Sequence, residues 1–246
     1  MADIDIHLFP CLNDNYGMLV HDPASGRTAS IDTPDGEEIA RQADARGWTI
    51  TEIWNTHWHP DHTGGNLLLK ERFGATIYGP GRVDGRIPGI DVKLGEGDAF
   101  DFGTHPVRVM ETPGHTTEHI VFYLEAAHDG KGACFVGDTL FTLGCGRLFE
   151  GTPEQMWESF GKILGLPDET KLYCAHEYTL SNAKFARSVD GGLPELEKAV
   201  SRYEAMRDRG EPTVPTTVAM EKATNPFWLA GSAEELGRRR ALKDAM

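Results

Sequence analysis

The feature that most constrains the fold is a series of short β-rich runs that end in Gly, Pro, His or Asp. Five runs are predicted to be strands, and they cover residues 51–55, 107–111, 120–124, 133–136 and 171–174. Four of the five end within a few residues of a His or an Asp. The pattern predicts a β-rich region over the first two-thirds of the chain. We expect an active site along the edge where these strand ends converge.

Helices are predicted between these runs and throughout the last third of the chain. They cover residues 36–46, 64–72, a segment that begins at Thr152, 183–189, 193–209 and 232–246. The helix after Thr152 has the clearest start, because Pro153 suits the first helical position and Gln155 completes a capping box. The change in character predicts an N-terminal domain of residues 1–178 and a helical domain of residues 179–246.

Composition narrows the class of protein. The 246 residues, 39% hydrophobic and 25% charged, exclude a disordered chain. Lys and Arg number 24 against 38 Asp and Glu, and the net charge of −14 argues against a nucleic-acid partner. Residues 1–7 are acidic without an apolar segment, and no apolar run approaches membrane-spanning length, so we expect a cytoplasmic protein without a membrane partner.

Residues 56–62, Thr-His-Trp-His-Pro-Asp-His, follow the first β-rich run and hold three of the ten histidines. In an extended segment alternate side chains face the same way, so His57 and His59 are placed to bind one cation. Asp61 and His62 follow the bend at Pro60 and can face a neighbouring position. Imidazole and carboxylate ligands suit Zn, Fe or Mn, and the absence of nearby thiolates favours an open, catalytic site over a structural one.

Three further candidate ligands follow later β-rich runs. They are His115 in Gly-His-Thr, Asp138 in Gly-Asp-Thr and His176 in His-Glu-Tyr. Each is a weak signal alone, and Asp138 by itself is more typical of an ordinary turn residue. Together with the first cluster they complete two four-ligand shells.

These motifs and their order resemble the metallo-β-lactamase superfamily, and over nearly the whole chain they resemble its glyoxalase II family, the hydroxyacylglutathione hydrolases. The resemblance implies an α+β protein, a four-layer αβ/βα sandwich of two mixed sheets with helices outside and a C-terminal helical domain. It also implies two metal ions. One would be held by His57, His59 and His115, the other by Asp61, His62 and His176, with Asp138 bridging both.

The same resemblance implies a set of substrate contacts. Residues 144–152, Gly-Cys-Gly-Arg-Leu-Phe-Glu-Gly-Thr, are similar to the family's G-R-x-F-E-G segment and nominate Arg147 and Phe149. Tyr178 follows the His-Glu pair, and Arg240 and Lys243 match the family's R-x-x-K pair, which would receive the glycine carboxylate of glutathione. The alternative for Arg147 is a surface ion pair, for Tyr178 a core position, and for the tail cations favourable charges at a helix C-terminus.

Four positions depart from the family pattern. Glu118 stands where Gly is usual, and Phe149 stands where some members have Tyr. Trp228 and Leu229 replace the common Leu-Arg pair after Asn-Pro-Phe.

The function implied is hydrolysis of S-2-hydroxyacylglutathione, such as S-D-lactoylglutathione, to glutathione and a 2-hydroxy acid such as D-lactate, in methylglyoxal detoxification. Hydroxide bound to two divalent ions, zinc first with iron or manganese as alternatives, would attack the thioester, with Asp61 assisting. We expect a monomer. One alternative is a mono-iron glutathione persulfide dioxygenase of the same superfamily, and another is a metal-stabilised binding module without turnover.

Overall fold

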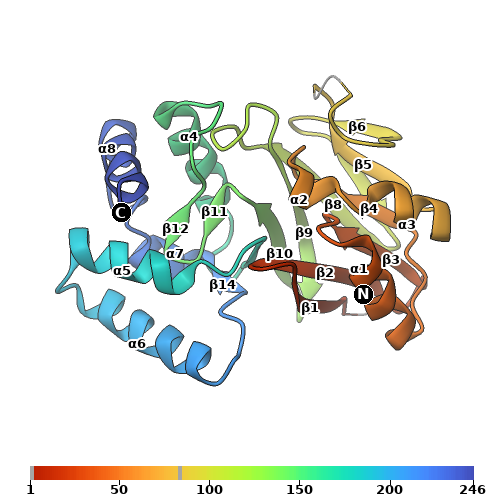
Figure 1. Cartoon of the computed structure of the whole chain (residues 1–246), viewed down its shortest axis with the longest axis horizontal. Coiled ribbons are helices and arrows are strands. Elements are labelled where there is room, and N and C mark those ends of the chain that lie inside the picture. The colour runs from red at the N-terminus through yellow and green to blue at the C-terminus, as the bar shows by residue number, and fades with distance from the viewer. Residues whose placement is uncertain (1–2, 83–84) are drawn as a thin grey trace. The chain divides into compact units, whose positions relative to one another are not determined.

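The computed structural model describes residues 3–82 and 85–246, which form two compact units (Figure 1). Unit 1 comprises Met1–Glu111 and Glu118–Gly137, and unit 2 comprises Thr112–Thr117 and Asp138–Met246. Met1 and Ala2, which belong to the acidic N-terminal segment, lie outside the described residues.

The first sheet of unit 1 is mixed. Its strand order is β1-β2-β3-β4-β5-β6, with bounds Asp5–Cys11, Asn15–Asp22, Arg27–Ile31, Glu52–Trp54, Thr76–Pro80 and Val92–Leu94. The first three strands pair antiparallel and the last four pair parallel. The parallel part places the C-terminal ends of β3 and β4 side by side, and the chain after each of these ends carries polar residues of the candidate site.

A second set of strands in unit 1 pairs antiparallel in the order β10-β9-β8-β7. The bounds of β7 to β10 are Ala99–Phe102, His105–Glu111, Ile120–His128 and Lys131–Gly137. Trp54 of β4 packs against this set, with ring centroids 5.2 Å from Phe102 and 5.4 Å from Phe122. Its neighbour Ile53 faces the opposite side, as expected when side chains alternate along a strand. The two sheets therefore enclose an aromatic core.

Helices cover the other face of the first sheet (Figure 1). They are α1 (Gly36–Arg46) and α3 (Asn66–Phe73), preceded by the short α2 (Pro60–Thr63). Ile39 and Ala43 of α1 pack with Leu69 of α3 in one core cluster. The helix predicted to begin at residue 64 begins at Asn66 instead, because the N–H of Gly64 bonds to the Pro60 carbonyl and so ends α2.

Unit 2 is mostly helical. Its strands are the hairpin of β11 (Leu140–Phe141) with β12 (Gly144–Cys145) and the pair of β13 (Lys171–Cys174) with β14 (Thr216–Thr217). Its helices are α4 (Pro153–Leu164), α5 (Thr179–Asp190), α6 (Pro194–Asp208), α7 (Val218–Thr224) and α8 (Ala233–Asp244). The capping box predicted at Thr152 is present at the start of α4. Leu143, Leu196 and Tyr203 contribute to a core beneath the hairpin.

The mixed sheets with helices confirm the predicted α+β class. The predicted helix over 183–189 begins a turn earlier, at Thr179. The functional division at residue 178 stays a prediction. None of the helices in the described ranges is long and apolar enough to cross a membrane.

Candidate active site

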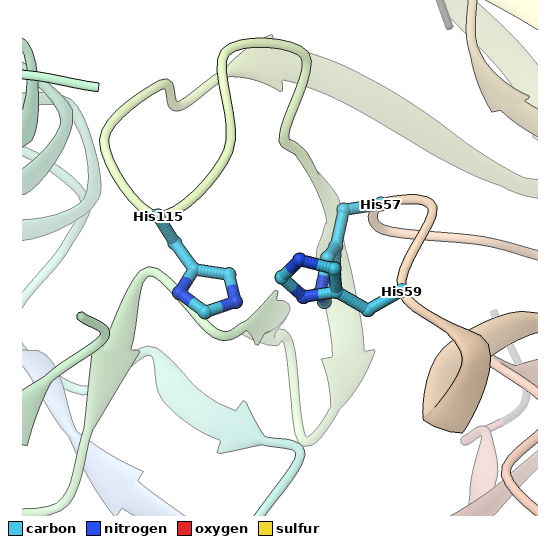
Figure 2. A group of neighbouring side chains, drawn as sticks. All are labelled: His57, His59 and His115. Carbon is cyan, nitrogen blue, oxygen red and sulfur yellow. The ribbon is translucent and has the colours of Figure 1, made fainter. Parts of the chain in front are cut away.

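The loop after β4 gathers three imidazoles of unit 1. Figure 2 shows the rings of His57 and His59 on this loop, and Nε2 of His57 lies 2.9 Å from Nδ1 of His59. Pro60 begins α2, so that Asp61 and His62 lie on its first turn. The ring centroids of His57 and His62 are 4.0 Å apart, and Oδ2 of Asp61 lies 3.6 Å from Nε2 of His62. Unit 1 thus places four ligand-type side chains together.

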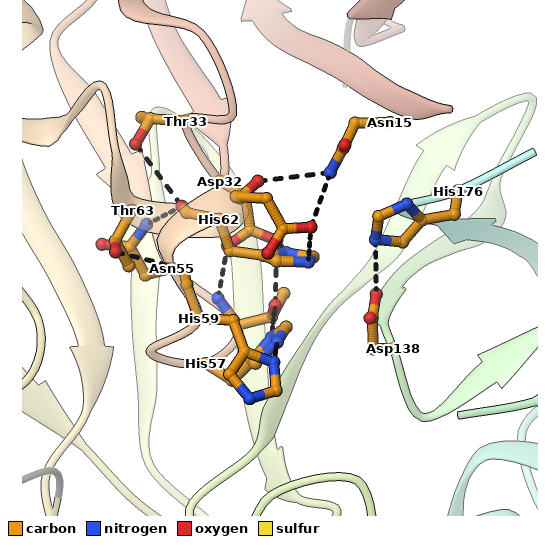
Figure 3. Close-up of polar contacts among 12 residues, drawn as sticks. Asn15, Asp32, Thr33, Asn55, His57, His59, His62, Thr63, Asp138 and His176 are labelled. Atoms are coloured by element: carbon orange, nitrogen blue, oxygen red, sulfur yellow. Dashed lines mark hydrogen bonds and ion pairs between the residues drawn. The ribbon is translucent and has the colours of Figure 1, made fainter. Parts of the chain in front are cut away.

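Asp32, which directly follows β3, holds this loop in place and is absent from the sequence prediction. Its Oδ1 accepts the Thr56 N–H at 2.7 Å, and its Oδ2 accepts the Nδ1–H of His62 at 2.9 Å (Figure 3). The residue is buried and has a left-handed backbone, with φ of +52°. The bond from Nδ1 leaves the lone pair of His62 on Nε2, which makes this nitrogen available to a cation. An Asp after a parallel strand was the available sequence signal.

Thr56 connects Asp32 to His57 and so fixes the tautomer of His57 as well. The Thr56 hydroxyl donates to Oδ2 of Asp32 at 2.8 Å and so is an acceptor for the Nδ1–H of His57 at 3.0 Å. His57 is therefore also fixed with its lone pair on Nε2. One buried carboxylate sets the tautomers of two histidines.

Unit 2 contributes the remaining three candidate ligands, each on a loop after a strand. Asp138 lies between two imidazoles, with Oδ2 at 3.4 Å from Nε2 of His115 and Oδ1 at 3.5 Å from Nε2 of His176 (Figure 3 shows the latter contact). All three side chains are buried. Asp138 therefore directs one carboxylate oxygen to each of two histidines.

His115, drawn in Figure 2, is oriented by the segment that follows the hairpin. Its Nδ1–H donates to the carbonyl of Arg147 at 2.9 Å, which again places the lone pair on Nε2. The backbone passes so closely at Gly146 that a Cβ there would lie 2.1 Å from the Asp138 carbonyl oxygen. This close approach requires glycine.

The predicted substrate contacts near the hairpin differ in exposure. Arg147 is 63% exposed, with Nε at 3.5 Å from Oδ1 of Asp244, so it does form a surface ion pair. Phe149 is 61% exposed, and its ring lies edge-on to His115 at 5.3 Å. The ring of Tyr178 stacks on that of His176, with centroids 4.9 Å apart and planes 2° from parallel.

The two cations of α8 are more enclosed. Arg240 is buried and donates to the Cys145 carbonyl at 2.8 Å and to Oδ1 of Asp244 at 2.9 Å. Lys243 donates to Oδ1 of Asn182, a buried side chain that sequence reasoning missed. Burial and the nearby Arg240 guanidinium lower the pKa of Lys243 to about 8. These contacts tie α8 to the hairpin and to α5.

Burial also affects Cys145, which lies inside the substrate motif. It raises the pKa of the Cys145 thiol to about 11, although the Arg240 guanidinium opposes the shift. A thiol with that pKa is not a thiolate at neutral pH, so Cys145 is a poor nucleophile.

Two residues that depart from the family pattern, Glu118 and Trp228, contact other side chains. Glu118 forms an ion pair with Arg86 at 2.8 Å, and the Arg86 guanidinium lies 4.4 Å from the centre of the Trp58 ring. Trp228 stacks on Trp157 of α4, with ring centroids 4.9 Å apart. Both residues stabilise local packing.

Comparison with known proteins identifies the class first. Residues 22–176 match the family model described as metallo-beta-lactamase superfamily, and residues 177–244 match the model described as hydroxyacylglutathione hydrolase C-terminus. The crystal structure of ETHE1 from Myxococcus xanthus superposes with a TM-score of 0.72 at 27% identity, covering 96% of this chain and 90% of that one. The fold is the metallo-β-lactamase fold, as expected.

The relatives narrow the class further. A hydroxyacylglutathione hydrolase of Maricaulis maris is 52% identical over 92% of this chain and 87% of its own length. A hydroxyacylglutathione hydrolase of Erythrobacter litoralis is 54% identical over 91% of this chain and 87% of its own length. The chain belongs to the hydroxyacylglutathione hydrolase family of the metallo-β-lactamase superfamily and is a thioester hydrolase, as the motifs predicted. The alternative of a persulfide dioxygenase is not favoured.

Proposed function

We propose that the enzyme hydrolyses S-2-hydroxyacylglutathione, S-D-lactoylglutathione above all, to glutathione and a 2-hydroxy acid such as D-lactate. The observation that carries the proposal is the stacking of Tyr178 on His176. Tyr178, which the resemblance assigns to the substrate side, stacks on a ligand-type histidine, and this contact supports the proposal. The names of the relatives and the matched C-terminal model support the same substrate class.

The proposed metal centre uses all seven candidate ligands. His57, His59 and His115 would hold one divalent ion, Asp61, His62 and His176 the other, and Asp138 both. The chemistry of the donor set fits, because His57, His62 and His115 all present Nε2 and Asp138 directs one oxygen to each of two imidazoles. Zinc is the first choice, with iron or manganese as alternatives. Such ions, when bound, lower the pKa of water toward about 7 and so supply hydroxide at neutral pH.

The chain's own residues bind the substrate and orient the attack. Lys243, with Arg240 and Arg147, would receive the glycine carboxylate of glutathione, and the exposed ring of Phe149 would cover the thioester. Asp61, whose side chain is 41% exposed, would accept a hydrogen bond from the attacking water and orient it. The leaving group is a thiolate whose thiol has a pKa of about 8.5, so no side chain needs to protonate it.

The wider role follows from this chemistry. We propose that the enzyme acts in methylglyoxal detoxification as a cytoplasmic monomer without a nucleic-acid or membrane partner. The net charge of −14 supports the absence of a nucleic-acid partner, because it repels polyphosphate.

The direct test supplies S-D-lactoylglutathione to metal-loaded protein and measures the loss of thioester and the release of thiol together. We expect hydrolysis that a chelator abolishes and added zinc restores, while circular dichroism stays unchanged. Oxygen uptake with glutathione persulfide serves as the comparison and should be absent. A folded, metal-loaded protein that leaves the thioester intact would contradict the proposal.

A further inference from the structure

Asn15 makes two contacts with Asp61 that no motif of the chain predicts. Its Nδ2 donates to Oδ2 of Asp61 at 3.1 Å and to the Asp61 carbonyl at 3.2 Å (Figure 3). The two residues are 46 positions apart, and Asn15 precedes residues 22–176, which the superfamily model matches. One amide therefore holds both the main chain and the carboxylate of a candidate ligand.

The position of Asn15 makes it a rigid donor. Asn15 begins β2 and pairs with Cys11 at the end of the β1–β2 hairpin. It is 6% exposed, whereas the Asp61 side chain is 41% exposed. A carboxylate that is this accessible samples several rotamers unless a fixed partner selects one. Asn15 supplies that partner from the ordered end of a strand.

The chemistry of an amide suits this role. A Lys or Arg at position 15 would neutralise the Asp61 carboxylate and compete with a cation for it. An Asp would repel it. The neutral amide engages Oδ2 and leaves the negative charge of Asp61 intact, which is what coordination of a cation requires.

We propose that Asn15 is a positioning residue that orients the Asp61 carboxylate toward the ion held by Asp61, His62 and His176. This inference rests on the proposed function, because it requires two ions. It assigns Asn15 to one of them only, since Asp61 is the residue that Asn15 contacts, and His57 of the other set is oriented separately through Thr56 and Asp32.

Three variants separate positioning from general damage. Asn15→Ala removes both donors, and Asn15→Asp replaces the amide with a like charge facing Asp61. Asn13→Ala is the matched control, because Asn13 is an exposed residue of the same turn. Thermal unfolding and circular dichroism establish whether each variant folds as the wild type does.

The measurement is the pair of stepwise zinc affinities, obtained by competition with a chromophoric chelator, followed by kcat and KM. We expect two ions in the wild type and in Asn13→Ala. In Asn15→Ala we expect one affinity to fall by about 10- to 100-fold while the other is retained, the usual effect of losing an outer contact. In Asn15→Asp the same zinc affinity should fall at least as far. In both variants kcat should fall by a larger factor than KM rises.

Three outcomes would overturn the inference. If the wild type binds two ions and Asn15→Ala binds both equally well, Asn15 does not position Asp61 and the proposed function stands. If Asn15→Ala weakens both affinities and lowers the melting temperature together, its role is structural. A folded wild type that binds fewer than two ions would overturn the proposed metal centre as well.

Discussion

At the scale of single residues, the candidate site is organised by hydrogen bonds that the Nδ1–H groups of three histidines donate. Thr56, Asp32 and the carbonyl of Arg147 accept from Nδ1 of His57, His62 and His115 respectively. Each bond leaves Nε2 with the lone pair. Because hydrogen bonds within the protein already fix these tautomers, the free energy of cation binding does not include the cost of orienting the three imidazoles.

Lys243 gives a pH-dependent prediction at the same scale. Its pKa is lowered to about 8, so the ammonium is charged below that pH and neutral above it. Since a neutral amine cannot pair with the glutathione carboxylate, we expect KM to rise as pH increases from about 7 to about 9, with kcat affected less. Lys243→Arg keeps its charge over this range and should flatten the rise in KM.

The control for this prediction is Lys184→Arg, because Lys184 is an exposed lysine of α5. It should follow the wild-type profile. A KM that rises equally with pH in Lys243→Arg and in the wild type would remove Lys243 from the binding site.

At the scale of elements, the β11–β12 hairpin connects the core of unit 2 to the site. Leu143 at its turn donates its N–H to Oε2 of Glu221, and Nδ2 of Asn225 donates to the Gly144 carbonyl at 3.0 Å. After the hairpin, Gly146 and Arg147 pass directly against Asp138 and His115. The hairpin therefore fixes the backbone that orients a candidate ligand.

Gly146→Ala tests the fit of this segment. The added Cβ would overlap the Asp138 carbonyl and force the segment away, and a displacement of about 1 Å at a reacting centre costs on the order of 100-fold in rate. We expect kcat/KM to fall by about that factor. Gly161→Ala in α4 is the control, because its Cβ meets nothing within 4 Å. That variant should keep full activity and gain about 0.5–1 kcal/mol of stability. Equal activity in both variants would show that the segment tolerates displacement.

Glu221 of α7 accepts a hydrogen bond from Leu143 of the hairpin turn. Its burial predicts an effect of pH on stability. It is fully buried, and burial raises its pKa to about 7 even though Thr216, Asn225 and the Leu143 N–H donate to it. The folded state therefore binds more protons than the unfolded state between about pH 4.5 and pH 7. With about 1.4 kcal/mol per unit, the free energy of unfolding should fall by about 3 kcal/mol as pH rises through this window.

The matched variants are Glu221→Gln and, as the control, Glu158→Gln at an exposed position of α4. Urea unfolding at about pH 5 and about pH 8 gives the free energy of each protein. The wild type should lose about 3 kcal/mol relative to Glu221→Gln between these pH values and nothing relative to Glu158→Gln. A constant difference between wild type and Glu221→Gln would show that Glu221 does not titrate in the folded state.

At the scale of the whole molecule, local signals in the sequence were sufficient for many elements but not for the contacts between them. The bounds of α1 and β13 agree with the prediction, because glycine stops, caps and short apolar runs are local signals. Strands β1 to β3 were missed, since their pairing partners define them more than their own composition does.

The same distinction holds for the candidate site. The histidine motif and its later partners are visible as residue types after strands. Asp32 and Asn15 act on residues 24 to 46 positions away, so only the folded backbone reveals them. The cations of the substrate side matched a motif, but their contacts with Asn182 and with the Cys145 carbonyl depend on tertiary packing.

The central claim is that seven side chains hold two ions that together support thioester hydrolysis. The most direct measurement titrates zinc into metal-free, folded protein and records bound metal per chain and S-D-lactoylglutathione hydrolysis on the same samples. The account predicts that activity follows occupancy and is complete only when two ions are bound per chain. Full activity at one ion per chain, or two bound ions without hydrolysis, would contradict it.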